Sequence, residues 1–359
     1  MPVVNQIEHK REILMTHLDM VAASKALTEP VQIIRPAEFH YRQHADMTLH
    51  RVHGQRRIGL YDQAKKEIID IAECPLMSAE LREWYQKVRE MLPSIQFGHF
   101  RVRVAPDGKR GIWLDFPNRV LAWFLEEERF FKRLCLDALV QIGQQHTQIG
   151  NKSGSLIRQD TELYPWSETY TGKKLKPQPL FSHVGAFSQA MNKELMKLVH
   201  DAVGSCLELK SWIELGAGCG NFTLYLASLQ KPVTAVEMYP LALCGMKKSL
   251  EVSGLLDWVE IIKANFHQPN KTLMNVFQSA NAGFGMLMDP PRSGMGAAFF
   301  ASIPDNSLPG AIVYLSCFAP SLARDAATLL KRGYQITSFK GLDQFPHSPH
   351  CEWVVVFRR

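Results

Sequence analysis

The hydrophobic period changes several times in the N-terminal half of the chain. Residues 5–27 carry apolar side chains every three or four positions, which predicts an opening helix. Residues 38–71 alternate apolar and polar positions, as antiparallel strands do. Residues 74–92 return to helical spacing, and residues 99–116 alternate around Pro106-Asp107-Gly108, which predicts a hairpin. This half therefore mixes helices with antiparallel strands.

The pattern then becomes more regular. A long helix is predicted over 119–143, and a polar connection rich in glycine and serine over 144–158. From about residue 185, short apolar strands alternate with helical stretches, which is typical of a doubly wound parallel sheet. The expected strands are 211–215, 232–237, 259–264, 284–289 and 311–317, with a closing pair in 334–345 and 351–357.

The fold class is therefore α/β: a C-terminal domain with a seven-stranded sheet, preceded by a smaller α+β domain. We expect an N-terminal helix over 1–30, a central α+β domain over 31–184 and an α/β domain over 185–359.

Composition narrows the class of protein. The 359 residues carry a net charge of +6, which suits contact with phosphate backbones without requiring it. The seven cysteines are scattered without a C-x-x-C pair, so no zinc or iron–sulfur spacing can be built. No apolar stretch reaches 18 residues, and the N-terminus lacks the apolar core of a signal peptide. We expect a cytoplasmic protein with no metal and no membrane segment, and nothing requires more than a monomer.

A glycine-rich turn carries the cofactor signal. The segment ELGAGCGN (214–221) follows an apolar strand and opens a helix, so Gly216 and Gly218 let the backbone approach a ligand. The next strand ends in Glu237, whose carboxylate suits the hydroxyls of a ribose. A dehydrogenase and a plain structural turn stay open, but the G-x-G-x-G spacing, the acid before it and Asn221 after it favour S-adenosyl-L-methionine.

Three further residues form a catalytic hypothesis. Asp289 ends the fourth strand, Cys317 ends the fifth, and Glu352 precedes the last. A thiolate that adds to carbon 6 of uracil makes carbon 5 nucleophilic toward a methyl sulfonium. A base must then remove the proton from carbon 5 before the thiol leaves. A nucleophile, a base and a polar anchor for the ring are therefore available.

Five segments resemble, in order, those of the RNA 5-methyluridine methyltransferase family, which includes the bacterial tRNA and 23S rRNA (uracil-5-)-methyltransferases. They are FSQAMN (187–192), ELGAGCGNF (214–222), MDPPRSGMG (288–296), YLSCFAPSLARD (314–325) and DQFPHSPHCEWVVVF (343–357). The match runs from residue 187 to the C-terminus and is looser over 38–92. The resemblance implies that residues 185–359 form a catalytic, Rossmann-like class I methyltransferase domain that uses S-adenosyl-L-methionine and acts on tRNA or rRNA. It also implies that the central domain over 31–184 recognises the RNA.

Carried over by position, the resemblance implies that Cys317 is the nucleophile and Glu352 the proton-abstracting base. It also implies that a further set of residues contacts the cofactor or lies beside the target base: Gln189, Gly216, Asn221, Glu237 and Asp289. The chain departs from the family at Phe318-Ala319, where Asn-Pro is usual after the nucleophile. The N-terminal barrel and the iron–sulfur cysteines of the rRNA members lack a counterpart, so the chain resembles the shorter, tRNA-type form.

Basic side chains are candidates for RNA contact. Arg101 and Arg103 alternate along one hairpin and Arg42 lies in the β-rich region, where they either grip phosphates or form a solvated strand face. Arg292 either clamps a phosphate or the cofactor carboxylate, or ties its loop to the sheet. Two other functions stay open: a cytosine-5 RNA methyltransferase, and a non-catalytic RNA-binding or RNA-folding protein that retains the fold.

Overall fold

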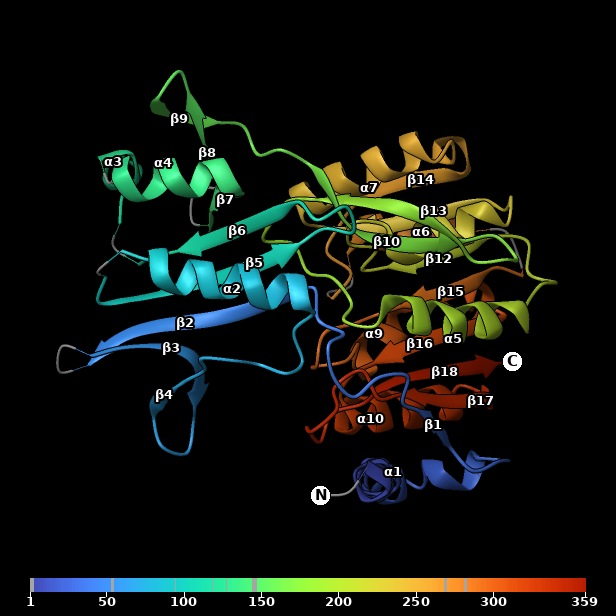
Figure 1. Ribbon diagram of the computed structural model, residues 1–359. Coiled ribbons are helices and arrows are strands. Elements are labelled where there is room, and N and C mark those ends of the chain that lie inside the picture. Colours follow the sequence, from blue (N-terminus) through green and yellow to red (C-terminus); the bar gives the residue numbers. More distant parts are fainter. Residues whose placement is uncertain are drawn as a thin grey trace. The chain divides into compact units, whose positions relative to one another are not determined.

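The computed structural model describes residues 3–52, 55–93, 95–117, 119–126, 128–143, 147–267, 270–280 and 283–359 (Figure 1). The chain forms two compact units. The C-terminal unit comprises Met1–Pro36, Thr169–Leu180 and Met191–Arg359, and the central unit comprises Ala37–Glu168 and Phe181–Ala190. The N-terminal residues therefore belong to the same unit as the glycine-rich turn and the candidate catalytic residues.

A mixed eight-stranded sheet forms the centre of the C-terminal unit, in the order β1-β17-β18-β16-β15-β12-β13-β14. Strand β18 is antiparallel to β16 and β17, whereas β1 and β17, β16 and β15, β15 and β12, β12 and β13, and β13 and β14 pair in parallel. The strands are β1 (Gln32–Ile34), β12 (Trp212–Leu215), β13 (Val233–Glu237), β14 (Val259–Lys263), β15 (Gly285–Met288), β16 (Ala311–Ser316), β17 (Gln335–Leu342) and β18 (Glu352–Arg358).

All seven strands expected from the sequence are present in this sheet. The expected count is nevertheless wrong, because β1 adds an eighth strand that pairs in parallel with β17 through Gln32 and Lys340. A strand of three residues is too short to leave an alternating pattern in the sequence.

Helices pack on this sheet in the manner of a doubly wound fold (Figure 1). They are α1 (Val3–Met20), α5 (Asn192–Gly204), α6 (Asn221–Ser228), α7 (Pro240–Val252), α8 (Lys271–Ser279), α9 (Ala297–Ser302) and α10 (Ala319–Lys331). Helix α5 packs on β16, β17 and β18, whereas α10 packs on β17, α9 and α1. Alternate strand residues such as Ile312 and Tyr314 enter one core together with Leu322 of α10, as the two-residue period of a strand requires.

The central unit contains a second eight-stranded sheet, in the order β4-β3-β2-β5-β6-β7-β8-β9. Its strands are β2 (His44–Val52), β3 (Gln55–Asp62), β4 (Glu67–Asp70), β5 (Phe97–Val104), β6 (Arg110–Asp115), β7 (Leu139–Ile142), β8 (Thr147–Lys152) and β9 (Ser155–Gln159). Helix α2 (Ala79–Met91) is capped by Ser78, whose hydroxyl oxygen accepts the Leu81 N–H at 3.2 Å. It buries Trp84, Tyr85 and Val88 at helical spacing.

Two expectations for the central unit are wrong. The stretch 119–143 holds α3 (Leu121–Glu126) and α4 (Glu128–Asp137) and then turns into β7, with residue 127 outside the described ranges. Val140 pairs with Ile112 of β6 and is fully buried, so pairing within the sheet outweighs continuation of the helix. The helical spacing of the first part of this stretch hides the strand at its end.

The stretch 144–158 is also more than a polar connection. It contains β8 and most of β9, which pair antiparallel around a turn at Ser153 and Gly154 with φ of 51° and 82°. Positive φ at both central residues fits the right-handed twist of a hairpin, and this turn explains the serine and glycine content. Residues 144–146 lie outside the described part of the chain.

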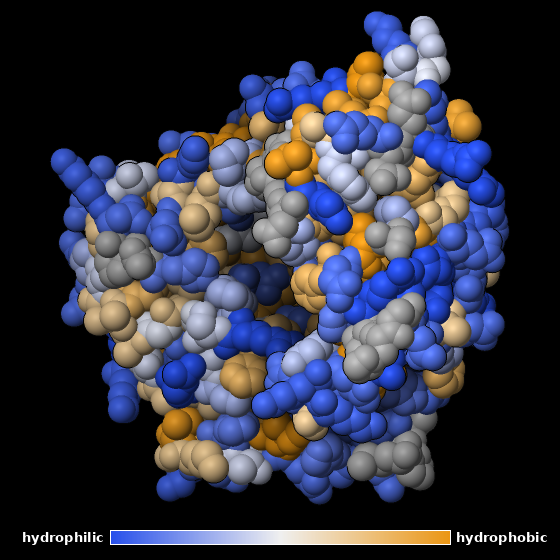
Figure 2. All heavy atoms as spheres, turned by 90° about the vertical axis from the view of Figure 1, so that its left-hand side faces the viewer, coloured by the Kyte–Doolittle hydropathy of each residue, from blue (hydrophilic) through white to orange (hydrophobic). Residues whose placement is uncertain are grey.

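The strands β10 (Tyr164–Thr171) and β11 (Lys176–Ser182) pair with each other and carry the chain from one unit to the other and back. Figure 2 shows hydrophobic residues scattered among hydrophilic ones on the face that it presents. Among the described residues, no helix combines the length and the apolar character needed to cross a membrane.

Candidate active site

The strand register brings three candidate residues to one edge of the C-terminal sheet. Asp289 directly follows β15, and Cys317 directly follows the parallel neighbour β16. Strand β18 runs in the opposite direction, and its Trp353 pairs with Ser316. Glu352 and Cys317 each lie one residue beyond this pair, at the carboxyl edge of the parallel strands. Ligands of doubly wound sheets bind at this edge.

The Cys317 thiol is half-buried and surrounded by charged groups. Burial raises its pKa above the usual value, and the carboxylates of Glu352 and Asp289 raise it further. The charge of Arg292 and a hydrogen bond with its side chain act in the opposite direction. Arg292, which the sequence offered as an RNA contact, therefore lies close enough to the sulfur to stabilise a thiolate.

Glu352 is a buried carboxyl group with one oxygen in use. Its side chain is 2% exposed, and Gln344 Nε2 donates to Oε2 at 2.8 Å. Oε1 has no hydrogen-bond partner among the described residues. Burial raises the pKa of Glu352 well above its usual value, Asp289 adds to this rise, and the Gln344 bond opposes it. Such a carboxylate is a stronger base than an exposed one.

The loop after Asp289 is fastened to the neighbouring elements by a buried carboxylate. Asp325 of α10 accepts the Met295 and Gly296 N–H groups at 2.7 and 3.0 Å and the Tyr314 hydroxyl of β16 at 2.5 Å. A Cβ atom at Gly294 would lie 2.6 Å from Asp325 Oδ2, so only glycine fits this close approach. The loop that carries Arg292 is thus held against the strand that leads to Cys317.

The glycine-rich turn lies where β12 has β13 on one side and β15 on the other. Glu237 accepts the Gly218 N–H at 2.9 Å and the Met238 and Tyr239 N–H groups at 2.7 and 2.8 Å. Gly216 and Gly218 have φ of 76° and 56°. A Cβ at Gly216 would approach the Phe266 ring to 2.9 Å, whereas one at Gly218 would meet open space. Together these groups form a concave turn, which we call the cradle, at the edge where ligands of doubly wound sheets bind.

Asn221 opens helix α6 and is engaged within the protein. Its side chain exchanges two hydrogen bonds with that of Asn192, at 2.7 and 2.9 Å, and its carbonyl oxygen accepts the Thr169 hydroxyl at 2.6 Å. The pairing ties the start of α6 to the start of α5. Asn221 therefore shapes the cradle at least as much as it offers donors to it.

A second buried carboxyl group, Glu214, lies at the base of the cradle. It is 1% exposed, and Thr223 donates its hydroxyl to Oε2 at 2.7 Å. Its Oε1 has no partner in the described part of the chain. Burial raises the pKa of Glu214 to about 8, the Asp289 and Glu237 charges add to the rise, and Thr223 opposes it. An unsatisfied buried oxygen at this position fits a site that a polar ligand completes.

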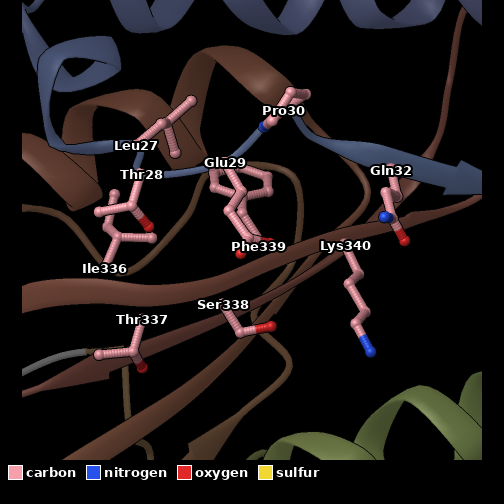
Figure 3. A pocket seen from close by; sticks show the side chains of 10 residues that line it. All are labelled: Leu27, Thr28, Glu29, Pro30, Gln32, Ile336, Thr337, Ser338, Phe339 and Lys340. Carbon is pink, nitrogen blue, oxygen red and sulfur yellow. The ribbon is translucent and has the colours of Figure 1, made fainter.

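Cys317 also lines a pocket of about 490 Å³, a volume that includes its open mouth. Helix α1 contributes Lys10, Ile13 and His17 to the wall, and the remaining lining residues are Phe318, Ala319, Pro320, Pro349, His350, Cys351 and Trp353. A second pocket lies between residues 27–32 and β17, and includes Glu29 and Lys340 (Figure 3). No cysteine lines this second pocket, and Lys340 is paired with Asp201 at 3.2 Å. Of these two pockets, the one beside Cys317 contains a candidate catalytic residue.

The candidate residues of the central unit have a different environment. Arg103 is 1% exposed, and its Nη1 donates to the Val184 and Ala186 carbonyls at 3.3 and 3.0 Å. The guanidinium of Arg103 is thus enclosed by protein, and an RNA contact there stays a prediction. Arg101 is mostly buried and pairs with Asp46 at 2.6 Å.

Arg42 of the central unit is half-buried, and Gln189 belongs to the same unit. The roles of these two residues stay predictions.

Sequence reasoning missed two side chains that hold the site together. Gln344 orients Glu352, and Asp325 fastens the loop after Asp289. Both lie inside segments that resemble the methyltransferase family, so the segments marked the correct regions without assigning these roles. In the described ranges, no three His, Cys, Asp or Glu side chains are grouped so as to hold a metal ion.

The sheet order, the glycine-rich turn after β12 and the polar groups at the strand ends define a Rossmann-like methyltransferase. Residues 182–359 match the family described as tRNA (uracil-5-)-methyltransferase. An RNA methyltransferase of Bdellovibrio bacteriovorus, described as uncharacterised, is 30% identical over 348 residues, which cover 94% of this chain and 86% of the relative. The chain belongs to the RNA (uracil-5-)-methyltransferase family, whose members depend on S-adenosyl-L-methionine.

Two further comparisons agree with this assignment. The 23S rRNA (uracil(1939)-C(5))-methyltransferase RlmD of Photorhabdus laumondii is 28% identical over 350 residues, covering 91% of this chain and 72% of the relative. The crystal structure of Pyrococcus abyssi tRNA (uracil-54, C5)-methyltransferase with S-adenosyl-L-homocysteine has a TM-score of 0.67 and 19% identity, and covers 99% of this chain and 84% of that one. At this identity, the second comparison supports the fold alone.

Proposed function

We propose that this protein methylates carbon 5 of a uridine in structured RNA through a covalent bond between Cys317 and carbon 6 of the ring. The observation that supports the proposal most strongly is the meeting of Cys317, Glu352 and Asp289 at one sheet edge, where the two carboxylates act on the thiol pKa. A nucleophile and a base of raised basicity within mutual electrostatic reach are what this reaction needs.

The cradle after β12 is the proposed cofactor site. Glu237 suits the ribose hydroxyls, and the positive φ of Gly216 and Gly218 lets the backbone pass close to the ligand. S-adenosyl-L-methionine supplies an electrophilic methyl group there and leaves as the neutral thioether. Asn221 is proposed to complete the site, and the role of Gln189 stays a prediction.

Cys317 begins the reaction as a thiolate, having released its proton to solvent. Its sulfur bonds to carbon 6 of uracil, and the electron pair of the C5–C6 double bond moves onto the carbon 4 carbonyl oxygen. Arg292 stabilises the thiolate, and Asp289 is proposed to orient the ring edge. Carbon 5 becomes nucleophilic through this addition and acquires the methyl group.

Glu352 completes the reaction. Its carboxylate takes the proton from carbon 5, the electron pair re-forms the C5–C6 double bond, and the C6–S bond breaks to release Cys317 as a thiolate. The protonated acid that results is well tolerated in this buried setting, because burial favours the neutral form of Glu352. The pocket lined by Cys317 and Phe318 is proposed to receive the target nucleotide.

The substrate class follows from the relatives. Those with stated substrates act on uracil in 23S rRNA or in tRNA, and we propose that this protein acts on an RNA of one of these classes. The net charge of +6 is compatible with such a partner.

A trapping experiment tests the proposed function. Purified protein is incubated with total RNA from cells that lack the gene, in the presence of tritiated S-adenosyl-L-methionine, and the nucleosides are identified by mass spectrometry. We expect labelled 5-methyluridine from the parent protein. A Glu352→Gln variant should accumulate a protein–RNA adduct that survives a denaturing gel, and a Cys317→Ala/Glu352→Gln variant should form none. Methylation of cytosine, or an adduct without Cys317, would overturn the proposal.

A further inference from the structure

Helix α1 carries a lysine that is almost fully enclosed. Lys10 is 1% exposed, although lysine is rarely buried without a partner. Its Nζ forms an ion pair with the fully buried Asp343 and donates to the Phe345 carbonyl oxygen at 2.9 Å. Arg35 provides a second cation, with Nε donating to Asp343 Oδ2 at 2.6 Å. A single carboxylate thus lies between two cations from the N-terminal part of the chain.

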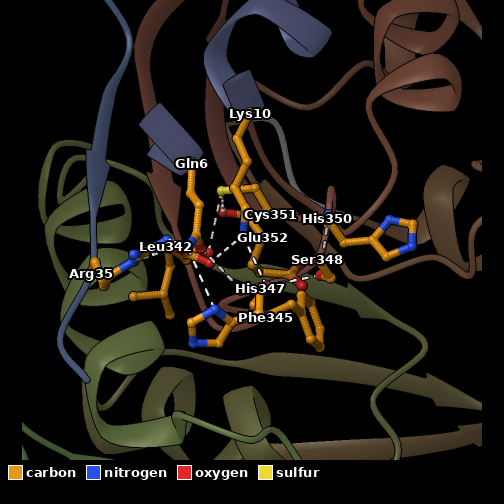
Figure 4. Close-up of polar contacts among 11 residues, drawn as sticks. Gln6, Lys10, Arg35, Leu342, Phe345, His347, Ser348, His350, Cys351 and Glu352 are labelled. Carbon is orange, nitrogen blue, oxygen red and sulfur yellow. Dashed lines mark hydrogen bonds and ion pairs between the residues drawn. The ribbon is translucent and has the colours of Figure 1, made fainter. Parts of the chain in front are cut away.

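These contacts hold the segment that leads from β17 to Glu352 (Figure 4). Gln6 lies one helical turn before Lys10. Its Oε1 accepts hydrogen bonds from the His347 N–H at 3.1 Å and from Arg35 Nη2 at 3.0 Å. His347 has φ of 64°, a left-handed conformation that side chains other than glycine rarely adopt. Since Gln6 bonds the strained residue itself, α1 stabilises the bend of the segment as well as its start.

The held segment continues directly into the candidate base. Gln344, which donates to Glu352 Oε2, is the next residue after Asp343, and the Asp343 N–H donates to the Ile34 carbonyl at 2.8 Å. Moving Asp343 would move Gln344, and the carboxyl group of Glu352 would lose its orientation. The chain of contacts therefore runs from Lys10 through Asp343 and Gln344 to Glu352.

We propose that Lys10 and Gln6 of helix α1 are positioning residues for Glu352, so that the N-terminal helix controls the proton-abstraction step of the reaction. This inference rests on the proposed function, in which Glu352 releases the covalent adduct. Lys10 lines the pocket beside Cys317, but its hydrogen bonds and ion pair are with Asp343 and Phe345, through which it acts on Glu352.

The test separates formation of the adduct from its resolution. A Lys10→Met variant keeps Asp343 paired with Arg35, so the carboxylate is not left without a cation. We expect its multiple-turnover rate to fall about tenfold, while the single-turnover rate of adduct formation stays within about threefold of the parent. The adduct should consequently accumulate during turnover, as it does for Glu352→Gln. Lys10→Arg, which keeps the charge and the donors, should restore most of the rate.

Matched controls make the outcome decisive. Arg11→Met changes the neighbouring residue of the same helix, whose contacts are Glu8 and the Val31 carbonyl, and should leave the adduct fraction unchanged. Gln6→Ala removes the bond to His347 and retains the ion pair between Lys10 and Asp343, so it should accumulate less adduct than Lys10→Met. It takes the place of Lys10→Met in the test if that variant fails to fold.

Two other results would carry different meanings. Equal slowing of adduct formation and resolution in both Lys10→Met and Gln6→Ala would overturn the positioning role. Accumulation of adduct in Arg11→Met would overturn it as well. If Glu352→Gln itself accumulated no adduct, the proposed function would fail instead, whatever the α1 variants did.

Discussion

The carboxyl edge of the C-terminal sheet and the β2–β5 face of the central unit both gather charged side chains, but they use them differently. At the sheet edge, Glu352 and Glu214 are buried, and one oxygen of each has no hydrogen-bond partner among the residues that the structure describes. On β5, Arg101 and Arg103 donate to backbone carbonyls of residues 184–186. An incompletely satisfied buried group costs stability, about 1–3 kcal/mol, and is retained where chemistry needs it.

The comparison therefore separates charges that serve a ligand from charges that serve the fold. The arginines fasten the segment that precedes α5 to strand β5 of their own unit. The carboxylates, by contrast, have pKa values that burial and neighbouring carboxylates raise, as is common at functional sites. Substitutions in the two regions should accordingly affect different measurements.

The largest expected effect is the loss of the nucleophile. Cys317→Ala should reduce methyl transfer by at least about 10⁴-fold, because carbon 5 of uracil is not nucleophilic without addition at carbon 6. Binding of S-adenosyl-L-methionine, measured by calorimetry, should change by less than about threefold, since the sulfur is absent from the cradle after β12. Residual transfer near the parental rate would show that the sheet edge is not the reaction centre.

The second prediction concerns the other region. Arg103→Met should lower the free energy of unfolding by about 2–4 kcal/mol, because the Val184 and Ala186 carbonyls lose a charged donor inside the protein. Urea denaturation measures this loss. Lys109→Met, an exposed change at the turn of the same hairpin, should stay within about 0.5 kcal/mol of the parent. If Arg103→Met were as stable as the parent but bound RNA more weakly, and if its binding depended less on salt concentration, Arg103 would serve RNA binding and not the fold.

The two regions also differ in how far the sequence predicts them. Asp289 and Cys317 could be placed together because consecutive parallel strands must end at one edge, and Glu352 because a closing antiparallel strand begins there. The alternation of Arg101 and Arg103 indicates a shared strand face, but nothing local reveals that residues 184–186 cover it. Burial depends on that distant segment, so the enclosure of Arg103 could not be predicted from the hairpin alone.

The contacts around α1 could not be predicted from the sequence either. Lys10 and Asp343 are separated by 333 positions, and no periodic pattern connects them. The helix itself was predictable from its spacing, and the segment around Glu352 from its resemblance to a family. The ion pair that joins them is a property of the folded chain alone. The eighth strand, β1, was missed for a related reason: three residues gain strand character only by pairing with β17.

A third prediction uses the pKa of Glu214. The folded value of about 8 lies above the ordinary 4.5, so the folded protein keeps a proton that the unfolded chain releases. The stability contributed by this group is fully present below pH 4.5 and is lost as the pH rises to about 8. Glu214→Gln cannot titrate, so it should be more stable than the parent at pH 7 by about 1–3 kcal/mol. Urea titrations from pH 5 to 8 should show the gain shrinking toward acid, whereas a gain independent of pH would reject the titration as its cause.

The smallest effect is expected at Arg292, whose charge lowers the pKa of Cys317 while burial and the two carboxylates raise it. Arg292→Gln removes the lowering influence, so the thiol should ionise at higher pH. The rate of adduct formation at neutral pH should fall about threefold, in line with a solvent-accessible charge. The alkaline rise of kcat/KM should move to higher pH, and at high pH the variant should match the parent, because both thiols are then ionised. If the rate of adduct formation stayed equally reduced at high pH, Arg292 would bind RNA or cofactor instead of assisting the thiolate. A strong dependence of this reduction on salt concentration would identify the phosphate backbone as the partner of Arg292.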